Sequence, residues 1–350
     1  MGNPIVQIDP ETRPGWDEFA RKHPCGLIYH LAGWKRLLEG CFPHIRGTVL
    51  ALMDGEEIRS ALPLYEVRSW LLGNRLVSIP YATICDPLVS GIQDASVLLD
   101  AADALRRNRN SSFLEVRTFN TAPLLHKRLS GCIFHKCHEI PLSEDPARVE
   151  KTFRANIRQR IRKTAKGTLR LRVGTSREDI CSLYRLNLKT RKRLGLPPQP
   201  FSFFEALREI FAPEGKVEIL SAERNGKAIA AVLLYKYKDR VSAEFTATDW
   251  TQIQFHPVHF LYWEAIRRAC AEGFRVFDLG RTDPDNEGLL HFKDSWGTRI
   301  VNLSSFYYPR LRSNSRKREV MRSPIVHKIF RTAPALATVL MGKFCYAHMG

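Results

Sequence analysis

The sequence contains two stretches of the same design, GTVLALMDGEEIRSALPLYEVRS at residues 47–69 and VEILSAERNGKAIAAVLLYKYKD at residues 217–239. In each, an apolar run of strand length is followed by a short polar turn and then by a longer apolar run. A predicted helix and a short strand that carries an acid and an Arg follow both stretches. We interpret the pattern as an internal duplication of one α/β unit, in which helices precede an antiparallel meander that a helix and a strand close.

Hydrophobic periodicity predicts the elements that surround the two stretches. In the first half it predicts helices over residues 16–22, 31–39 and 94–107 and strands over 47–53, 58–68, 75–80 and 112–117. In the second half it predicts helices over 149–166, 176–193, 203–211 and 257–272 and strands over 216–223, 227–237, 240–248 and 274–280. The sequence therefore predicts an α/β (α+β) protein with mixed, mainly antiparallel sheets.

Changes in composition divide the chain into an N-terminal subdomain at residues 1–143, a C-terminal subdomain at 144–309 and a basic tail at 310–350. The join lies in LSEDPARVEKTF, where Ser143, acids and a proline favour the start of a helix. The tail begins with a basic run and ends in an amphipathic segment that Pro334 interrupts. We expect a packed terminal helix there, with docking on anionic lipid as the alternative.

Charge is the strongest signal in the composition. The 350 residues carry a formal net charge of +18, which indicates an anionic partner such as RNA, a nucleotide-linked or lipid-diphosphate-linked molecule, or an anionic membrane face; charge that serves only solubility is the alternative. The eight cysteines follow no metal-site or disulfide spacing, so we expect no metal and a reducing compartment. No segment has the apolar length of a membrane span or a signal peptide, which favours a cytoplasmic protein that is at most peripheral to the inner membrane face.

The predicted helix over 149–166 concentrates positive charge. Phe153, Ile157 and Ile161 recur at four-residue steps and predict a core-facing stripe. The acids of this segment stop at Glu150, and its other faces carry a run of bases: Arg154, Arg158, Arg160, Arg162, Lys163 and Lys166. Guanidinium groups repel one another unless an anion lies among them, so we predict that these bases contact phosphate or RNA; a solvated basic surface is the alternative.

A second candidate site lies in VFDLGRTDPDNEGLLHFKDSWG, residues 276–297. Arg281 follows a strand of buried character, and an apolar turn then carries Phe292, Lys293 and Trp296. Cationic and aromatic side chains gathered on one short segment are typical of a pocket wall.

Three stretches resemble the Fem-type aminoacyltransferases, the branch of the GNAT superfamily that builds peptidoglycan cross-bridges from aminoacyl-tRNA. They are YHLAGWKRLL, SLYRLNLKTRKRLGLPPQPFSFFEAL and FDLGRTDPDNEGLLHFKDSWG. The likeness covers about residues 17–308 and is greatest to Fem-like proteins of exopolysaccharide and envelope gene clusters. It implies two tandem GNAT-like acyltransferase subdomains, a channel through the second and an acceptor groove between them.

The resemblance also implies a site and a choice of donor. The Phe-Lys pair that lies beside the new bond in the related transferases matches Phe292 and Lys293. The helical-hairpin insert with which several Fem ligases contact tRNA is absent, and the loop WTQIQFHPVHFLYW lacks the glycine with which CoA-dependent GNAT enzymes bind pyrophosphate. We therefore expect no bound cofactor and leave the donor open between aminoacyl-tRNA and acyl-CoA.

Roles for the side chains follow from the chemistry of acyl transfer. Lys293 is the candidate for stabilising the oxyanion, with a surface pair to Asp294 as the alternative. Arg281 is expected to bind a phosphate or an acceptor carboxylate unless it bridges to Asp278 or Asp283. Asp278 could deprotonate the attacking amine, although such an acid more often orients an Arg.

Four further residues are candidates for binding the acceptor. Arg191 and Arg193 could hold its phosphates, or they serve only as positive charge at the end of a helix. Tyr81 and Asp86 could line the acceptor groove, although a turn at Asp86 explains them almost as well. No triad, phosphate-loop or zinc-protease motif is present.

The leading hypothesis is an acyltransferase that moves an aminoacyl or acyl group onto an amine or hydroxyl of a cell-envelope precursor, peptidoglycan or polysaccharide. The first alternative is an acyl-CoA-dependent N- or O-acetyltransferase that acts on an exopolysaccharide or a small amine. The second is a non-catalytic RNA-binding or scaffold protein that displays its positive charge on a GNAT fold. We expect a monomer rather than an obligate oligomer.

Overall fold

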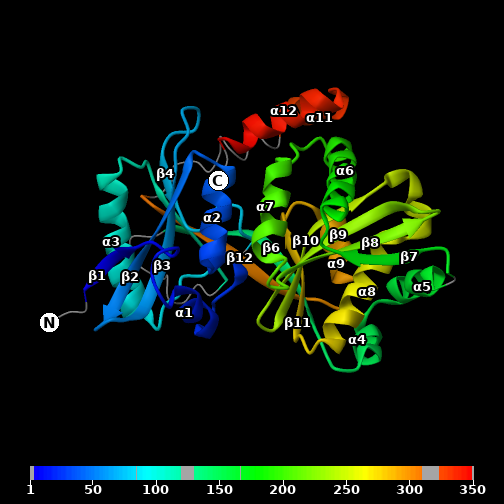
Figure 1. Cartoon of the computed structure of the whole chain (residues 1–350), viewed down its shortest axis with the longest axis horizontal. Coiled ribbons are helices and arrows are strands. Elements are labelled where there is room, and N and C mark those ends of the chain that lie inside the picture. The colour runs from blue at the N-terminus through cyan, green and yellow to red at the C-terminus, as the bar shows by residue number, and fades with distance from the viewer. Residues whose placement is uncertain (1–3, 84, 120–129, 166, 310–322, 349–350) are drawn as a thin grey trace. The chain divides into compact units, whose positions relative to one another are not determined.

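The computed structural model describes residues 4–83, 85–119, 130–165, 167–309 and 323–348, and for residues 130–134 the backbone only. The chain divides into two compact units. The first unit holds residues 1–134, 302–320 and 344–350, and the second holds residues 135–301 and 321–343. Figure 1 shows strands and covering helices in each unit.

The sheet of the first unit has the strand order β1-β2-β3-β4-β5-β12. All neighbours run antiparallel except β4 and β5, which are parallel. The strands are β1 (Ile5–Ile8), β2 (Ile45–Asp54), β3 (Glu57–Val67), β4 (Arg75–Val77), β5 (Leu114–Thr118) and β12 (Arg299–Tyr308), which belongs to this unit from residue 302 onward. The helices are α1 (Trp16–Lys22), α2 (Ala32–Cys41) and α3 (Ile92–Asn108), and α3 connects the two parallel strands.

The sheet of the second unit has the order β6-β11-β10-β9-β8-β7 and repeats this design. Only β10 and β11 run parallel, and α8 (Pro257–Ala271) connects them. The strands are β6 (Ser130–Pro141, in this unit from residue 135), β7 (Arg170–Gly174), β8 (Val217–Arg224), β9 (Lys227–Tyr237), β10 (Arg240–Thr248) and β11 (Val276–Thr282). The other helices are α4 (Pro146–Thr152), α5 (Ala155–Thr164), α6 (Arg177–Leu194), α7 (Phe201–Phe211), α9 (Glu287–Asp294), α11 (Pro324–Thr332) and α12 (Ala335–Tyr346), whose residues from 344 onward belong to the first unit.

The two topologies confirm the predicted duplication and fold class. In each unit, three antiparallel strands are followed by a helix and by a strand that returns parallel to the third. An antiparallel partner then covers the outer edge of the returning strand, β12 in the first unit and β6 in the second. A crossover through a helix is what a parallel pair requires, which is why the helix recurs at the same place.

The predicted helix over 149–166 is wrong in one respect, because it is two helices. The stripe of Phe153, Ile157 and Ile161 is buried in the core as expected. Arg154 interrupts the helix, since its backbone is extended and its N–H donates to the carbonyl of Ser295 at 2.9 Å. The chain there follows a tertiary hydrogen bond that periodicity cannot reveal. Asp145, not Ser143, caps α4 by accepting from the N–H of Ala147 at 2.9 Å.

Several elements differ from prediction. The periodicity missed β1, β7 and β12, which lie outside the repeated stretches and owe their conformation to neighbouring strands. The apolar turn expected before Lys293 is the helix α9, which Asn286 caps by accepting from the N–H of Leu289 at 3.1 Å. The expected terminal helix is the pair α11 and α12, separated at Pro334 because proline has no N–H to continue the first helix. No helix in the described ranges is long and apolar enough to cross a membrane.

Candidate active site

The parallel strands β10 and β11 separate inside the second unit. Their pairing runs from Arg240 and Val276 to Ser242 and Asp278. Directly after it both strands become irregular, β10 between residues 243 and 245 against β9, and β11 between residues 278 and 281 against β6. Irregular strands that diverge leave backbone groups available to other partners. Gly280 lies in this irregular segment with a left-handed φ of +73°, which glycine adopts at no steric cost.

Lys293 uses two of these freed carbonyl groups. Its side chain comes from α9 and is buried, and its Nζ donates to the carbonyl oxygens of Gly280 at 2.8 Å and Arg281 at 3.2 Å. Burial lowers the pKa of Lys293 to about 8, although the nearby carboxylate of Asp278 favours its charged form. An ammonium has three N–H groups, and these two carbonyls are its partners among the described residues. One N–H therefore remains for a ligand.

Asp278 is the acid of the site, and its partner is Arg240. One carboxylate oxygen accepts from the N–H of Gly280 at 2.7 Å and the other from Arg240 at 3.1 Å. Burial raises the pKa of Asp278, although Arg240 opposes the shift. The alternative bridge from Asp278 to Arg281 is not formed, because Asp278 pairs with Arg240. Asp278 thus fastens the Gly280 backbone that Lys293 contacts.

Arg240 connects Asp278 to a second buried acid, Glu139 of β6. The guanidinium of Arg240 lies 2.5 Å from Glu139, which also accepts from Nε of Arg299 at 2.9 Å. Burial disfavours the charge of Glu139, but the two guanidinium groups hold the pKa of its carboxyl below the usual value. Sequence reasoning missed Arg240 and Glu139. The signal was present, since acids and bases within otherwise apolar strands require partners when buried.

Aromatic rings form the wall behind Lys293. Phe292 is half-buried against the core, and its ring lies 5.5 Å from that of His259. Trp296, a predicted ligand contact, is fully buried, with Phe153 at 5.2 Å and Tyr262 at 5.6 Å. We assign Trp296 to packing, because a fully buried indole has no surface to offer a substrate.

The basic face of α5 lies beside the start of α8. Arg160 donates to Nε2 of His259 at 3.2 Å. Burial and the charge of Arg160 lower the pKa of His259 to about 3, and burial, Arg160 and Lys163 lower that of His256, the residue before α8. The positive charges of α5 thus add to the positive potential at the N-terminal end of α8, where the free N–H groups of a helix already favour anions.

The remaining predicted bases have different surroundings. Arg154 forms an ion pair with Asp294. In the alternative interpretation of Lys293, Asp294 would have paired with that lysine. Arg158 and Arg162 have no side-chain partner in the described part of the chain, with Arg158 half-buried and Arg162 exposed. Arg281 is exposed, and its carbonyl holds Lys293.

The candidates on α6 lie in its last turn. The guanidinium of Arg193 stacks 4.0 Å from the ring of Trp250, and Arg191 is half-buried. Gly195 ends the helix in a left-handed conformation. Their positive charge lies where a helix C-terminus favours it, so the structural role proposed for these arginines has a physical basis.

The candidates of the first unit make internal contacts. The hydroxyl of Tyr81 donates to the carbonyl of Tyr346 at 2.8 Å. Asp86 is buried and accepts from the Thr118 hydroxyl and from the N–H of Phe119 at 2.7 Å. Both side chains thus hold the loop after β4 in place. Over the described ranges no group of His, Cys, Asp and Glu is arranged to hold a metal ion.

A parallel pair of strands that is joined by a helix and then diverges is the strand order of GNAT-type domains, and a buried lysine lies at the divergence. Residues 151–294 match the model of the acetyltransferase (GNAT) domain. The chain therefore contains a GNAT-type acyltransferase domain in its second unit. No curated protein matches the chain by sequence.

Solved structures with the same fold cover nearly the whole chain. FemX has a TM-score of 0.71 at 14% identity, over 87% of this chain and 97% of its own. L-PGS from Bacillus licheniformis has a TM-score of 0.56 at 14% identity, over 94% and 97%. A tandem GNAT protein from the clavulanic acid biosynthesis pathway has a TM-score of 0.55 at 12% identity, over 87% and 97%. The Fem-like tandem GNAT resemblance is confirmed at the level of the fold.

Proposed function

We propose that the protein is a Fem-type acyltransferase that transfers an aminoacyl or acyl group to an amine or hydroxyl of a cell-envelope precursor. The likeness to FemX, which extends over both units, supports the class. The observation that carries the proposal is the buried ammonium of Lys293 at the divergence of β10 and β11. Two backbone carbonyls orient it, and one N–H is left to donate.

The reaction gives that ammonium a definite task. The acceptor nitrogen or oxygen attacks the acyl carbonyl carbon, and negative charge develops on the carbonyl oxygen. As the tetrahedral intermediate collapses, the bond to the donor breaks: an ester C–O bond for aminoacyl-tRNA or a thioester C–S bond for acyl-CoA. The acceptor loses a proton and the departing group gains one. A fixed cation in a dry site stabilises the developing oxyanion, and removing such a donor costs about 10²–10³-fold in rate.

Asp278 acts in this proposal as a positioning residue. Asp278 is fully buried, and its oxygens accept from the N–H of Gly280 and from Arg240, so we give it a positioning role and not that of the base for the acceptor. By fastening Gly280 it sets the direction of the carbonyl that orients Lys293. Loss of Asp278 should therefore act through the lysine.

The donor is proposed to bind through its phosphates along α5. Arg158 and Arg162 are available for this contact, and Arg160 and Lys163 add positive potential at the start of α8. This charge suits both aminoacyl-tRNA and acyl-CoA. Acyl-CoA is the second candidate donor, and the match to the acetyltransferase domain model supports it. If neither donor supports transfer, a non-catalytic RNA-binding role would explain the positive charge.

The test compares the two donors on the purified protein with a matched pair of variants. We expect transfer from one donor, and a loss of about 10²–10³-fold in turnover for Lys293→Met with an unchanged melting temperature. Lys227→Met removes the same charge from the exposed first residue of β9 and should keep full activity. Equal activity of the two variants would reject the assignment of Lys293. RNA binding that weakens steeply with salt, with no transfer from either donor, would favour the scaffold instead.

A further inference from the structure

The helices α11 and α12 are held firmly on one side. Phe330 of α11 is buried, and Thr338 and Gly342 of α12 are buried four residues apart. A Cβ on Gly342 would lie 2.6 Å from the carbonyl oxygen of Pro198, so the backbone of α12 lies directly on the second unit there. The opposite faces of these helices are therefore a fixed part of the surface.

Those opposite faces are strongly apolar. Ile325 and Ile329 are one turn apart on α11, with exposed fractions of 71% and 46%. Leu336, Leu340 and Phe344 follow at four-residue steps on α12, with exposed fractions of 73%, 60% and 53%. A soluble helix normally buries such a stripe, so an exposed one indicates a binding surface.

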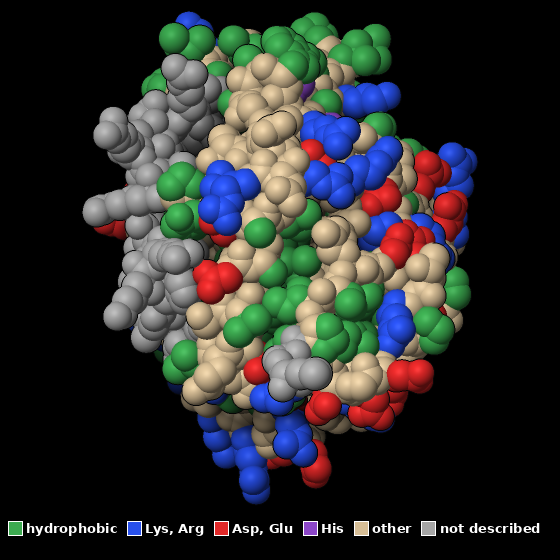
Figure 2. Space-filling model, turned by 90° about the vertical axis from the view of Figure 1, so that its left-hand side faces the viewer, with side chains coloured by type: hydrophobic (Ala, Val, Ile, Leu, Met, Phe, Trp, Pro, Cys, Tyr) green, Lys and Arg blue, Asp and Glu red, His purple; other side chains and the backbone are tan. Residues whose placement is uncertain are grey.

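The exposed aliphatic side chains of these helices form one surface within the second unit. Hydrophobic side chains are green in Figure 2, where they gather along the upper edge of the face drawn. We name the apolar surface of Ile325, Ile329, Leu336 and Leu340 the docking face.

The charge around the docking face is of one sign. Lys328, Arg331 and Lys343 are exposed on the same two helices. The described residues 323–348 contain no Asp or Glu. Long basic side chains beside an apolar stripe suit a surface with anionic headgroups above hydrocarbon. A second copy would bring like charges opposite one another, which disfavours self-association through this face.

We infer that the docking face binds the surface of a membrane that contains anionic phospholipid. The aliphatic side chains enter the boundary between headgroups and acyl chains, and the basic residues contact the headgroup phosphates. The inference does not depend on the reaction proposed above, since none of these residues contacts Lys293.

The test is flotation of the full chain with vesicles of phosphatidylcholine alone or with about 30 mol% phosphatidylglycerol. We expect binding to the anionic vesicles, weakened by salt, and an affinity reduced by about tenfold or more in the triple variant Ile325→Ser/Leu336→Ser/Leu340→Ser. The control Val97→Ser/Val173→Ser/Ile300→Ser changes exposed apolar residues elsewhere and should bind like the unaltered chain.

Three outcomes would overturn the inference. The unaltered chain could fail to float with anionic vesicles, or the triple variant could float as well as the control. A dimer that the triple variant converts to a monomer, without vesicle binding by either, would assign the face to a second copy. Melting curves of both triple variants establish that each is folded, because the substituted side chains are exposed.

Discussion

The ammonium of Lys293 lies 2.8 Å from the carbonyl oxygen of Gly280, thirteen residues earlier in the chain. The orientation of the buried cation therefore depends on a backbone that only glycine adopts easily, with φ at +73°. Asp278 binds the N–H of the same glycine. One residue thus couples the acid, the lysine and the point where β10 and β11 diverge.

Gly280→Ala should lower transfer activity more than it lowers stability. An added Cβ meets nothing closer than 3.7 Å, so the cost is the left-handed backbone, about 1–2 kcal/mol. Relief of that strain turns the carbonyl away from Lys293, and we expect turnover to fall by at least about tenfold. Gly226→Ala is the matched control, because Gly226 has φ +70° in the turn between β8 and β9 and open space around it. If both variants lose the same stability and keep the same turnover, the carbonyl does not orient the lysine.

The pH dependence of transfer should report Lys293. With a pKa of about 8, its ammonium is present below that pH and is lost above it, so turnover should fall as pH rises through about 8. Lys293→Arg should remove this alkaline limb, because a guanidinium stays charged. A rate that stays level to pH 9.5 or above in the unaltered protein contradicts the assignment.

Unfolding does not explain such an alkaline loss. The folded pKa of Lys293 is below the ordinary value of 10.5, so between about 8 and 10.5 the unfolded chain holds a proton that the folded chain lacks. Stability from this group therefore increases with pH across that window. Circular dichroism at each pH separates the two effects.

Arg240→Gln should destabilise the second unit by about 3–5 kcal/mol, since it leaves Asp278 and Glu139 buried without their shared cation. Arg299→Gln is the control. Its side chain is 63% exposed and contacts only Glu139 of the pair, so we expect a loss of at most about 1 kcal/mol. Urea unfolding measures both, and equal losses would show that the buried network does not stabilise the fold.

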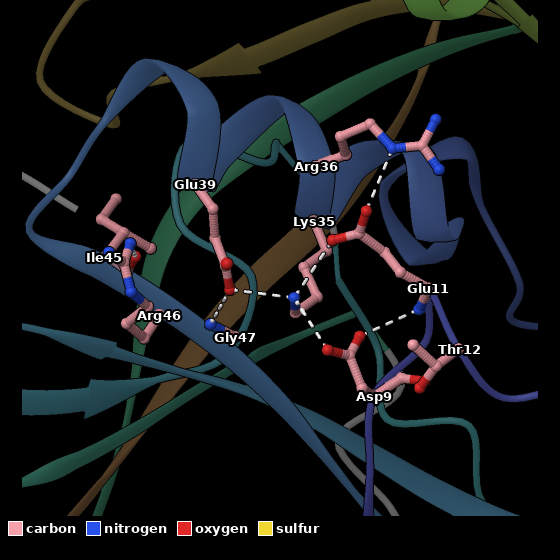
Figure 3. A network of polar contacts seen from close by, with 9 residues as sticks. All are labelled: Asp9, Glu11, Thr12, Lys35, Arg36, Glu39, Ile45, Arg46 and Gly47. Atoms are coloured by element: carbon pink, nitrogen blue, oxygen red, sulfur yellow. Dashed lines mark hydrogen bonds and ion pairs between the residues drawn. The ribbon is translucent and has the colours of Figure 1, made fainter.

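Lys35→Met should destabilise the first unit. Figure 3 shows the ammonium of Lys35 among the carboxylates of Asp9, Glu11 and Glu39, at 3.2, 3.1 and 3.1 Å. Removing it leaves three acids close together, and we expect a loss of about 2–3 kcal/mol at pH 7. Arg36→Met is the control, because its exposed side chain pairs with Glu11 alone among the described residues and should contribute less than about 1 kcal/mol.

The same lysine predicts a pH effect on stability. Burial acts against its charge, but the three carboxylates raise the pKa of Lys35 above its ordinary value of 10.5. Its contribution is complete below 10.5 and is lost as pH rises through the raised folded value. The difference in unfolding free energy between the unaltered chain and Lys35→Met should therefore be constant near pH 7 and shrink above 10.5. A difference that grows there would mean that the carboxylates do not hold the ammonium.

The comparison of the repeated stretches shows what local sequence can determine. Residues 47–69 and 217–239 predict the strands β2, β3, β8 and β9, because alternating side chains and polar turns are properties of neighbouring residues. The helix between the parallel strands is amphipathic in both units, so hydrophobic periodicity predicts it as well. From these elements the duplicated fold could be predicted, whereas the choice of Lys293 as a candidate depended on the resemblance to the Fem-type transferases.

Only the tertiary structure decided the partners. Asp278 binds Arg240 instead of Arg281, Asp294 binds Arg154 instead of Lys293, and Trp296 packs in the core. The local sequence around Asp278 or Asp294 cannot name these partners, because the bases come from strands and helices far away in the chain and approach only after the sheet and its helices have packed. Periodicity tells which face of an element is apolar, whereas burial, hydrogen bonding and the pKa of a buried charge depend on whatever the rest of the chain places against that face.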